Sequence, residues 1–233
     1  MTEIGANLRA VKERVARAAE RSGRDSSAVE LMVVTKTWLP PVITEVVEAG
    51  HSLLGENKLQ EAEAKIPQLP DDLRWHFIGH LQRNKARKAL ALFEAIHSVD
   101  SLRLACHLNR IAGEMDRKPS IFLQVNAARE ESKSGFSLGE LCEALPEITR
   151  LANLDLVGLM SIPPVVVEPE AARPSFRALR TLRDELQEGT GISLPGLSMG
   201  MSHDFEIAIE EGATVVRVGS SIFGPRRRPV VPD

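Results

Sequence analysis

Lys36 is the residue whose position first suggests chemistry. It ends a short apolar run, residues 30–35, and Trp38 follows it by two positions. Partial desolvation beside apolar side chains lowers the pKa of an ammonium group and leaves an amine that can form an imine with a carbonyl compound. A lysine that closes a strand is more often a solvated flanking residue, so Lys36 alone does not establish a site.

A second group of residues has the composition of a phosphate site. Gly219 has no side chain to obstruct an anion, and Gly219 and Ser220 can present backbone N–H groups. Ser202 is expected to begin a helix, which would add a hydroxyl and a helix N-terminus. An ordinary Gly-Ser turn and an ordinary helix cap are the alternatives, and the residues alone leave the two interpretations evenly balanced.

Arg217 stands in the middle of an apolar run, residues 214–218. A buried cation needs a partner, so a purely structural role is the less comfortable interpretation. If its side chain points inward, it could donate a hydrogen bond to the ring nitrogen of a cofactor.

The elements that must position these residues alternate regularly. Short apolar runs predict eight strands, near residues 30–35, 51–54, 75–78, 95–99, 121–125, 154–160, 196–199 and 214–218. Amphipathic segments between them predict helices, one of them from about residue 81 to residue 92. A further helix precedes the first strand and stops near Gly23. The stretch 161–175 contains four prolines and is expected to be a loop over the barrel mouth.

This alternation favours an α/β fold, a single-domain (β/α)₈ TIM barrel over residues 1–233 with an N-terminal helix. A Rossmann-like open sheet is the rival, but no Gly-x-Gly-x-x-Gly opens a helix after any predicted strand. In such barrels the functional groups follow the strands at their C-terminal ends, and the loops after strands seven and eight often hold a phosphate. Lys36, Ser202 and Gly219 should therefore converge.

Composition limits the classes of partner. The net charge is -3 and aromatic residues make up 4% of the chain, with no tyrosine, which argues against nucleic-acid binding. No apolar run reaches membrane-spanning length, and no secretory leader is apparent at the start. Cys106 and Cys142 are not spaced like the cysteine ligands of a metal site. We expect a cytoplasmic monomer that binds neither metal nor membrane.

Three other groups of residues favour ordinary interpretations. Ser202, His203 and Asp204 are the residue types of a hydrolase triad, but adjacent residues cannot readily form its hydrogen-bonded chain. The basic residues of segment 83–88 are typical of a solvated helix face, with phosphate or RNA binding as the alternative. The histidines near strand ends are expected to be packed and hydrogen-bonded, and they are His51, His76 and His97.

Six segments, in order along nearly the whole chain, resemble the pyridoxal phosphate homeostasis family, also called the YggS/PROSC group. They are VTKT (34–37), GEN (55–57), WHFIGHLQRNK (75–85), SKSGF (132–136), GLMSI (158–162) and LSMGMSHD (197–204). The resemblance implies a barrel similar to the N-terminal domain of alanine racemase. Two departures, Leu54 and Lys58 where many members have an aromatic residue, imply weaker stacking near the cofactor ring.

By the same resemblance, pyridoxal 5′-phosphate is the cofactor and Lys36 is its imine lysine. Ser202, Gly219 and Ser220 are then expected to bind the phosphate and Arg217 to face the pyridine nitrogen. The pocket lining is expected to include Asn57, His80, Met160 and Ser161.

The cofactor alone does not decide between enzyme and carrier. Racemases of the alanine type use a lysine and a tyrosine from a second domain as their two bases, and this sequence has no tyrosine and no second domain. An arginine opposite the ring nitrogen also makes the ring a poorer electron sink, although alanine racemases share it. We therefore expect a carrier or buffer for vitamin B6 homeostasis, without turnover, which could pass the cofactor to apo-enzymes. The alternatives are a racemase or decarboxylase of amino acids, and a class I aldolase acting on a sugar phosphate.

Overall fold

Eight parallel strands close into a barrel in the computed structural model, which describes residues 2–126, 134–164 and 166–225. The strands are β1 (Glu30–Val34), β2 (Leu53–Glu56), β3 (Arg74–Phe77), β4 (Ala95–Val99), β5 (Ser120–Gln124), β6 (Asp155–Met160), β7 (Gly196–Met201) and β8 (Val215–Val218). Each strand pairs with its sequence neighbours, and β1 pairs with β8 to complete the closure. All eight predicted strands and the TIM barrel are confirmed.

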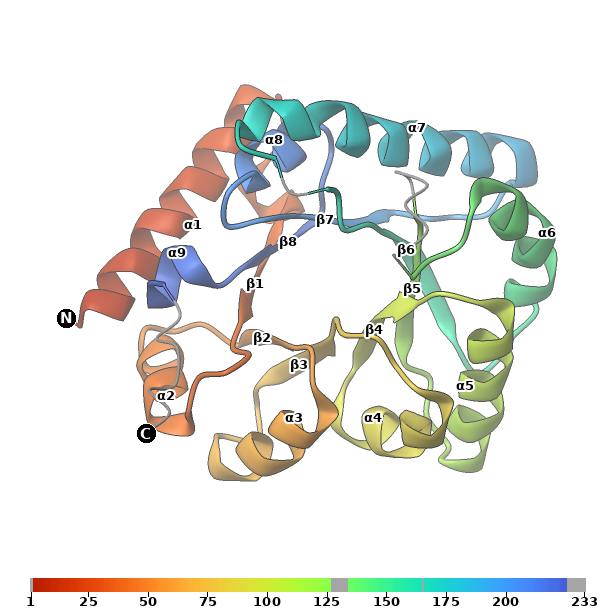
Figure 1. Cartoon of the computed structure of the whole chain (residues 1–233), viewed down its shortest axis with the longest axis horizontal. Coiled ribbons are helices and arrows are strands. Elements are labelled where there is room, and N and C mark those ends of the chain that lie inside the picture. Colours follow the sequence, from red (N-terminus) through yellow and green to blue (C-terminus); the bar gives the residue numbers. More distant parts are fainter. Residues whose placement is uncertain (1, 127–133, 165, 226–233) are drawn as a thin grey trace, which may run out of the picture.

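Helices surround the strands as an outer layer (Figure 1). They are α1 (Glu3–Arg21), α2 (Pro40–Glu48), α3 (Leu59–Lys65), α4 (Ala86–Leu92), α5 (Leu102–Glu114), α6 (Leu138–Ile148), α7 (Arg173–Thr190), α8 (Phe205–Glu210) and α9 (Ser220–Phe223). Single 3₁₀ turns occupy Ser26–Ala28, Ile66–Gln68, Arg83–Lys85 and Pro169–Ala172. Because each helix carries the chain back along the outside of the sheet, the C-terminal ends of all the strands meet at one mouth of the barrel.

The N-terminal helix α1 lies beside α8 and α9 on the outside of the barrel (Figure 1). Thr2 caps it by accepting a hydrogen bond from the Gly5 N–H at 3.2 Å. Its apolar face buries Leu8, Val11 and Val15. One polar contact adds to this packing, because the Asn7 side chain donates to the Ile222 carbonyl oxygen at 3.0 Å. The first helix thus supports the last one.

Three local predictions differ from the structure. The helix predicted from residue 81 begins at Ala86, because residues 83–85 form a 3₁₀ turn first. The stretch 161–175 is not all loop: it contains the turn Pro169–Ala172 and the first turn of α7, where proline at an early helical position is tolerated. Helix α9 follows β8 directly and was not predicted, since four residues are too few to show a helical period.

The core has two layers separated by the strands. A large apolar cluster fills the space between sheet and helices, with Phe77, Phe93 and Phe176 among its fully buried members. A small cluster inside the barrel consists of Met32, Leu53, Phe122, Met160 and Val215. The barrel is therefore a packed interior and not a channel, and a ligand can enter only at its ends.

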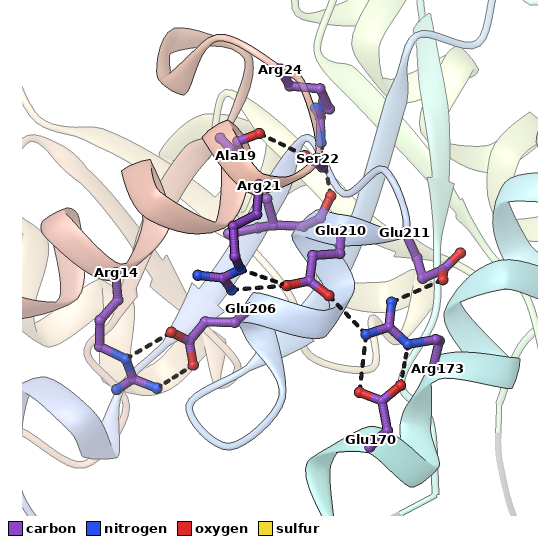
Figure 2. Close-up of polar contacts among 11 residues, drawn as sticks. Arg14, Ala19, Arg21, Ser22, Arg24, Glu170, Arg173, Glu206, Glu210 and Glu211 are labelled. Atoms are coloured by element: carbon purple, nitrogen blue, oxygen red, sulfur yellow. Dashed lines mark hydrogen bonds and ion pairs between the residues drawn. The ribbon is translucent and has the colours of Figure 1, made fainter.

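Arginines and glutamates join α1, α7 and α8 on the outer face (Figure 2). Glu211 follows α8 with its side chain 5% exposed, and its two oxygens lie 3.1 Å from nitrogens of Arg173, Arg177 and Arg180. Burial alone would raise the pKa of Glu211, but the hydrogen bonds from Arg177 and Arg173 outweigh burial and hold the pKa below its usual value. The carboxylate thus ties α7 to the chain after α8.

Replacing Glu211 by glutamine should lower the free energy of unfolding by about 2 kcal/mol near pH 7, because three guanidinium groups lose their shared anion. The contribution of a carboxylate with a lowered pKa is present above its usual value and disappears as the pH falls through the folded value. Urea unfolding at several pH values measures this. The exposed Glu188→Gln in α7 is the control, and an equal loss there, or a difference that persists in acid, would contradict the prediction.

Candidate functional site

A cavity of about 470 Å³ opens at the C-terminal mouth of the barrel. Among the residues that line it are most of the sequence candidates, namely Lys36, Asn57, His80, Ser202, Arg217, Gly219 and Ser220. Two larger hollows, about 590 Å³ at the opposite mouth and about 720 Å³ beside α6 and α7, contain none of these seven residues. The amine, the phosphate loops and the guanidinium therefore share one cavity, as the fold predicts.

Lys36 stands in a tight turn directly after β1. The turn is closed by the Trp38 N–H, which donates to the Thr35 carbonyl oxygen at 3.1 Å. Thr37 has φ of 72°, a left-handed conformation that costs a β-branched residue of the order of 1–3 kcal/mol. The half-buried Lys36 is consequently held on a strained segment, which needs support from its surroundings.

A buried ion pair supplies that support. The Lys65 ammonium lies 2.7 Å from Glu56 Oε1 and donates to the Thr35 carbonyl oxygen at 3.0 Å. The Thr35 hydroxyl also donates to Glu56 at 2.8 Å. Burial raises the pKa of Glu56, and the contact with Lys65 opposes that rise.

The same lysine links the ion pair to the far side of the turn. Lys65 Nζ lies 3.3 Å from Glu61 Oε2, and this oxygen accepts a hydrogen bond from the strained Thr37 N–H at 2.8 Å. Burial would raise the pKa of Glu61, but the bonds from Thr37 and Lys65 outweigh it and the pKa lies below its usual value. Both sides of the Lys36 turn are thus fixed by charges from β2 and α3.

Ser202 joins the loops after β7 and β8. Its hydroxyl oxygen accepts hydrogen bonds from the Gly219 N–H at 3.1 Å and the Ser221 N–H at 3.4 Å, and the Ser221 hydroxyl donates to the Ser202 carbonyl oxygen at 3.2 Å. A Cβ at Gly219 would lie 3.1 Å from the Val34 carbonyl oxygen, which shows how closely the loop approaches β1. A hydroxyl and several backbone N–H groups therefore gather at one place, the usual composition of a phosphate cradle.

The prediction that Ser202 begins a helix is wrong. Strand β7 continues to Met201, and α8 begins only at Phe205, with Asp204 at the N-cap position. The Asp204 carboxylate accepts a hydrogen bond from the Met201 N–H at 2.7 Å and so closes the intervening turn. Ser202 contributes its hydroxyl to the loops but no helix N-terminus.

Arg217 is 4% exposed, yet its side chain reaches the cavity. One terminal nitrogen donates to the carbonyl and hydroxyl oxygens of Ser198, both at 2.7 Å, and the other donates to the Ser161 carbonyl oxygen at 2.8 Å. Burial lowers the pKa of Arg217 to about 10, against the opposing attraction of Asp204. The guanidinium therefore stays charged at neutral pH in a fixed orientation.

The other candidates lie at different depths. His80 is exposed, and its Nδ1 lies 3.1 Å from the Asp100 carboxylate at the rim. Met160 is fully buried in the cluster inside the barrel, below the cavity lining, and Ser161 holds Arg217 through its carbonyl oxygen. Asn57 Oδ1 and Ser161 Oγ are buried atoms without a hydrogen-bond partner among the described residues. Glu56 Oε2, outside the cavity lining, is a third such atom. Buried polar atoms of this kind are uncommon, and a bound ligand or water can supply the missing partner.

Sequence reasoning missed several residues of the site. The lining also contains Trp38, Ile78, Ile162, Met201, His203 and Gly224. Trp38 stacks on Phe223 at 5.2 Å between ring centroids, so α9 forms part of the wall. Ser221, which bonds to Ser202, could have been predicted, because it directly follows the predicted phosphate residues Gly219 and Ser220. No local sequence pattern marks the apolar residues of the lining.

The remaining groups have structural partners. Ser202, His203 and Asp204 form no triad, since His203 Nε2 contacts the Val167 carbonyl oxygen at 2.9 Å while Asp204 bonds to Met201. His51 bonds to the Leu53 carbonyl oxygen at 3.0 Å, as expected of a packed histidine. The basic face of segment 83–88 is paired in part, with ion pairs from Lys88 to Glu63 and from Arg87 to Glu114.

The described residues show neither a metal-binding cluster nor a membrane-spanning helix. No group of three or more His, Cys, Asp or Glu side chains is arranged to hold a metal ion in the described part of the chain. Among the helices of residues 2–126, 134–164 and 166–225, none is long and apolar enough to cross a membrane. The residues 132–133 of the SKSGF segment lie outside the described residues.

Comparison with known proteins identifies the family. The profile of the alanine racemase N-terminal domain matches residues 6–227. The pyridoxal phosphate homeostasis protein of Aquifex aeolicus is 44% identical over 221 residues, which cover 94% of this chain and 97% of that protein. Its counterpart in Pseudomonas aeruginosa is 41% identical over 227 residues, 97% of each chain. This chain belongs to the pyridoxal phosphate homeostasis protein family.

Solved structures agree with this assignment. PipY of Synechococcus elongatus PCC7942, in a structure with pyridoxal phosphate bound, is 42% identical with a TM-score of 0.81, covering 92% of this chain and 100% of that one. An alanine racemase of Clostridium difficile 630 has a TM-score of 0.73 but only 16% identity, over 96% of this chain and 58% of that one. The racemase shares the barrel fold, and nothing more is inferred from it.

Gly79 marks a close approach that shapes the site in this family member. A Cβ at Gly79 would lie 1.9 Å from the Asn57 carbonyl oxygen, a backbone atom that cannot move without displacing the end of β2. Only glycine allows the ends of β2 and β3 to come together beneath the cavity.

Gly79→Ala should therefore lower the free energy of unfolding by about 2 kcal/mol, through forced separation of the two strand ends. Chemical denaturation measures the loss. Gly139→Ala is the matched control, because a Cβ there meets nothing within 4 Å and alanine suits a helix. Equal stabilities of the Gly79 variant and the unsubstituted chain would contradict the close approach.

Proposed function

We propose that this protein binds pyridoxal 5′-phosphate in the cavity at the C-terminal mouth, linked covalently to Lys36, and contributes to vitamin B6 homeostasis as a carrier or buffer. The observation that carries the proposal is the convergence of a half-buried lysine, a phosphate cradle and a buried guanidinium on one cavity. The names of the curated relatives and the PipY structure with bound cofactor support it.

The residues of the cavity fit this cofactor. Ser202 and the N–H groups of Gly219 and Ser220 supply neutral donors for a phosphate, and a phosphate oxygen can take over the bonds that Gly219 and Ser221 now make to Ser202. The buried, unpartnered Asn57 Oδ1 and Ser161 Oγ indicate that protein groups alone leave the site incomplete. A cavity with a guanidinium in its wall and a phosphate cradle beside it suits a small aromatic phosphate.

The cofactor supplies an aldehyde that exchanges between amines. In the proposed site, Lys36 contributes the amine, and the Lys65 network keeps its turn in place. Arg217 donates to the pyridine nitrogen and, as a permanent cation, leaves that nitrogen unprotonated. Asn57 and His80 line the pocket, while Ser161 orients Arg217 and Met160 packs beneath the ring.

A carrier fits the residues of the cavity better than a racemase or decarboxylase of amino acids. The sequence has no tyrosine to act as a second base. The two histidines of the described lining have other partners, since His80 lies beside Asp100 and His203 contacts the Val167 carbonyl oxygen. An unprotonated ring nitrogen also withdraws fewer electrons, so carbanion chemistry gains less from the cofactor. We further propose a cytoplasmic monomer without bound metal, which passes the cofactor to apo-enzymes.

Lys36→Ala should abolish the visible absorbance of the bound cofactor while the barrel stays folded, because Lys36 is the one lysine among the described residues that line the cavity. Borohydride reduction followed by peptide mass analysis should place the added mass of the unsubstituted protein on Lys36. Lys58→Ala, an exposed lysine on the next loop, is the matched control and should retain the absorbance. A normal spectrum in the Lys36 variant would refute the assignment.

Amino-acid turnover should be absent. Loaded protein incubated with alanine in deuterium oxide should exchange the α-proton no faster than free pyridoxal 5′-phosphate does, since the sequence has no tyrosine to act as the second base. Proton NMR of the alanine signal follows the exchange. A rate well above that of the free cofactor would support the racemase or decarboxylase alternative and overturn the carrier.

A further inference from the structure

A chain of hydrogen bonds crosses the barrel interior from the cofactor cavity to the opposite mouth. Arg217 donates to the Ser198 hydroxyl at 2.7 Å, and this hydroxyl lies 2.8 Å from His97 Nδ1. His97 Nε2 lies 3.0 Å from His76 Nδ1, and His76 Nε2 lies 2.8 Å from Glu94 Oε1. Five side chains from β3, β4, β7, β8 and the residue before β4 thus make one continuous connection.

The chemistry of its two ends determines the direction of every bond. A guanidinium can only donate hydrogen bonds, so the Ser198 oxygen must accept from Arg217. An ionised carboxylate can only accept, and the hydrogen bond to His76 holds the pKa of Glu94 below its usual value, so Glu94 is ionised at neutral pH. When both rings are neutral, each group between the ends must therefore accept on the Arg217 side and donate on the Glu94 side.

With both rings neutral, one arrangement satisfies all four contacts. His76 donates from Nε2 to Glu94 and accepts at Nδ1, so His97 must donate from its own Nε2. His97 then accepts at Nδ1, and the Ser198 hydroxyl is its donor. Burial, with repulsion from the Arg217 cation, holds the pKa of His97 well below its usual value, which agrees with a neutral ring.

The surroundings make this chain of hydrogen bonds costly to break. His97 is fully buried and stacks on Phe122 with 4.1 Å between ring centroids, and His76 is 5% exposed. In such an interior an unmade hydrogen bond leaves a polar atom without water to replace the partner. Of the five residues, Glu94 and His76 line the hollow at the opposite mouth, where Arg74 and Glu30 complete the charges around Glu94.

We propose that Ser198, His97 and His76 are positioning residues for Arg217, with both histidines held as Nε2–H tautomers by the Glu94 carboxylate. The chain of hydrogen bonds fixes one nitrogen of the guanidinium, so that its remaining N–H groups stay directed toward the cavity. The consequence for cofactor binding rests on the proposed function, whereas the tautomers and the hold on Arg217 do not.

Nitrogen-15 NMR of the unsubstituted protein without cofactor tests the tautomers directly. At pH 7 both rings should show a protonated Nε2 and an unprotonated Nδ1, with the two signals assigned from their loss in His76→Gln and His97→Asn variants. A predominant Nδ1–H form, or a charged ring, at either histidine would overturn the proposal. This measurement needs no ligand, so it stands even if the protein proves not to bind the cofactor.

Cofactor retention tests the effect on Arg217. His97→Phe keeps the stack on Phe122 but removes both ring nitrogens, and it should weaken pyridoxal 5′-phosphate binding about five- to tenfold and shift the absorbance of the bound cofactor, because one orienting hydrogen bond to the guanidinium network is lost. His97→Asn should recover part of the affinity, since its amide oxygen can accept from Ser198. His51 lies outside this chain of hydrogen bonds, so His51→Phe is the matched control and should bind the cofactor normally.

The outcomes separate the two claims. Unchanged affinity and absorbance in a folded His97→Phe protein, or equal losses in His51→Phe, would overturn the positioning role. If His97→Phe fails to fold, His97→Asn decides, and it must bind more weakly than the unsubstituted chain with a shifted absorbance. If the unsubstituted chain itself takes up no cofactor, the proposed function is wrong and the NMR result alone decides the positioning inference.

Discussion

Burying one guanidinium inside a closed barrel is the constraint on which the arrangement of the site depends. A cation in this position is tolerable only when hydrogen-bond acceptors surround it. Ser198 in β7 and Ser161, directly after β6, supply those acceptors for Arg217. The interior is consequently divided into a polar upper part around Arg217 and an apolar lower cluster that includes Met32 and Phe122.

The two functional sides of the cavity are fixed by different kinds of interaction. The Lys36 turn has an unfavourable backbone at Thr37 and is held by the buried Lys65 ion pairs, which come from elements next to β1 in sequence. The loops after β7 and β8 are held by neutral hydrogen bonds through Ser202, between residues 17 and 19 positions apart. Charge therefore stabilises the strained side, whereas neutral groups hold the Ser202 side.

Much of this could be predicted from sequence, because the signals were local. Alternating apolar runs indicated the barrel, and known barrel geometry then placed Lys36, Ser202 and Gly219 at one mouth. The start of α8 was mispredicted because a serine in a turn looks like a serine at a helix cap. The path through Ser198 and His97 escaped notice because these residues are 101 positions apart and meet only across the closed barrel.

The closure of the barrel between β1 and β8 has a consequence for the order in which the protein becomes functional. A ribosome makes Lys36 early and Gly219 late, and helix α1 must wait for α8 and α9 before its apolar face is covered. Contacts of such long sequence separation form slowly and late in folding. The cavity is thus complete only after the whole barrel has been synthesised and closed, and a nascent chain that ends before β8 lacks Arg217, Gly219 and Ser220.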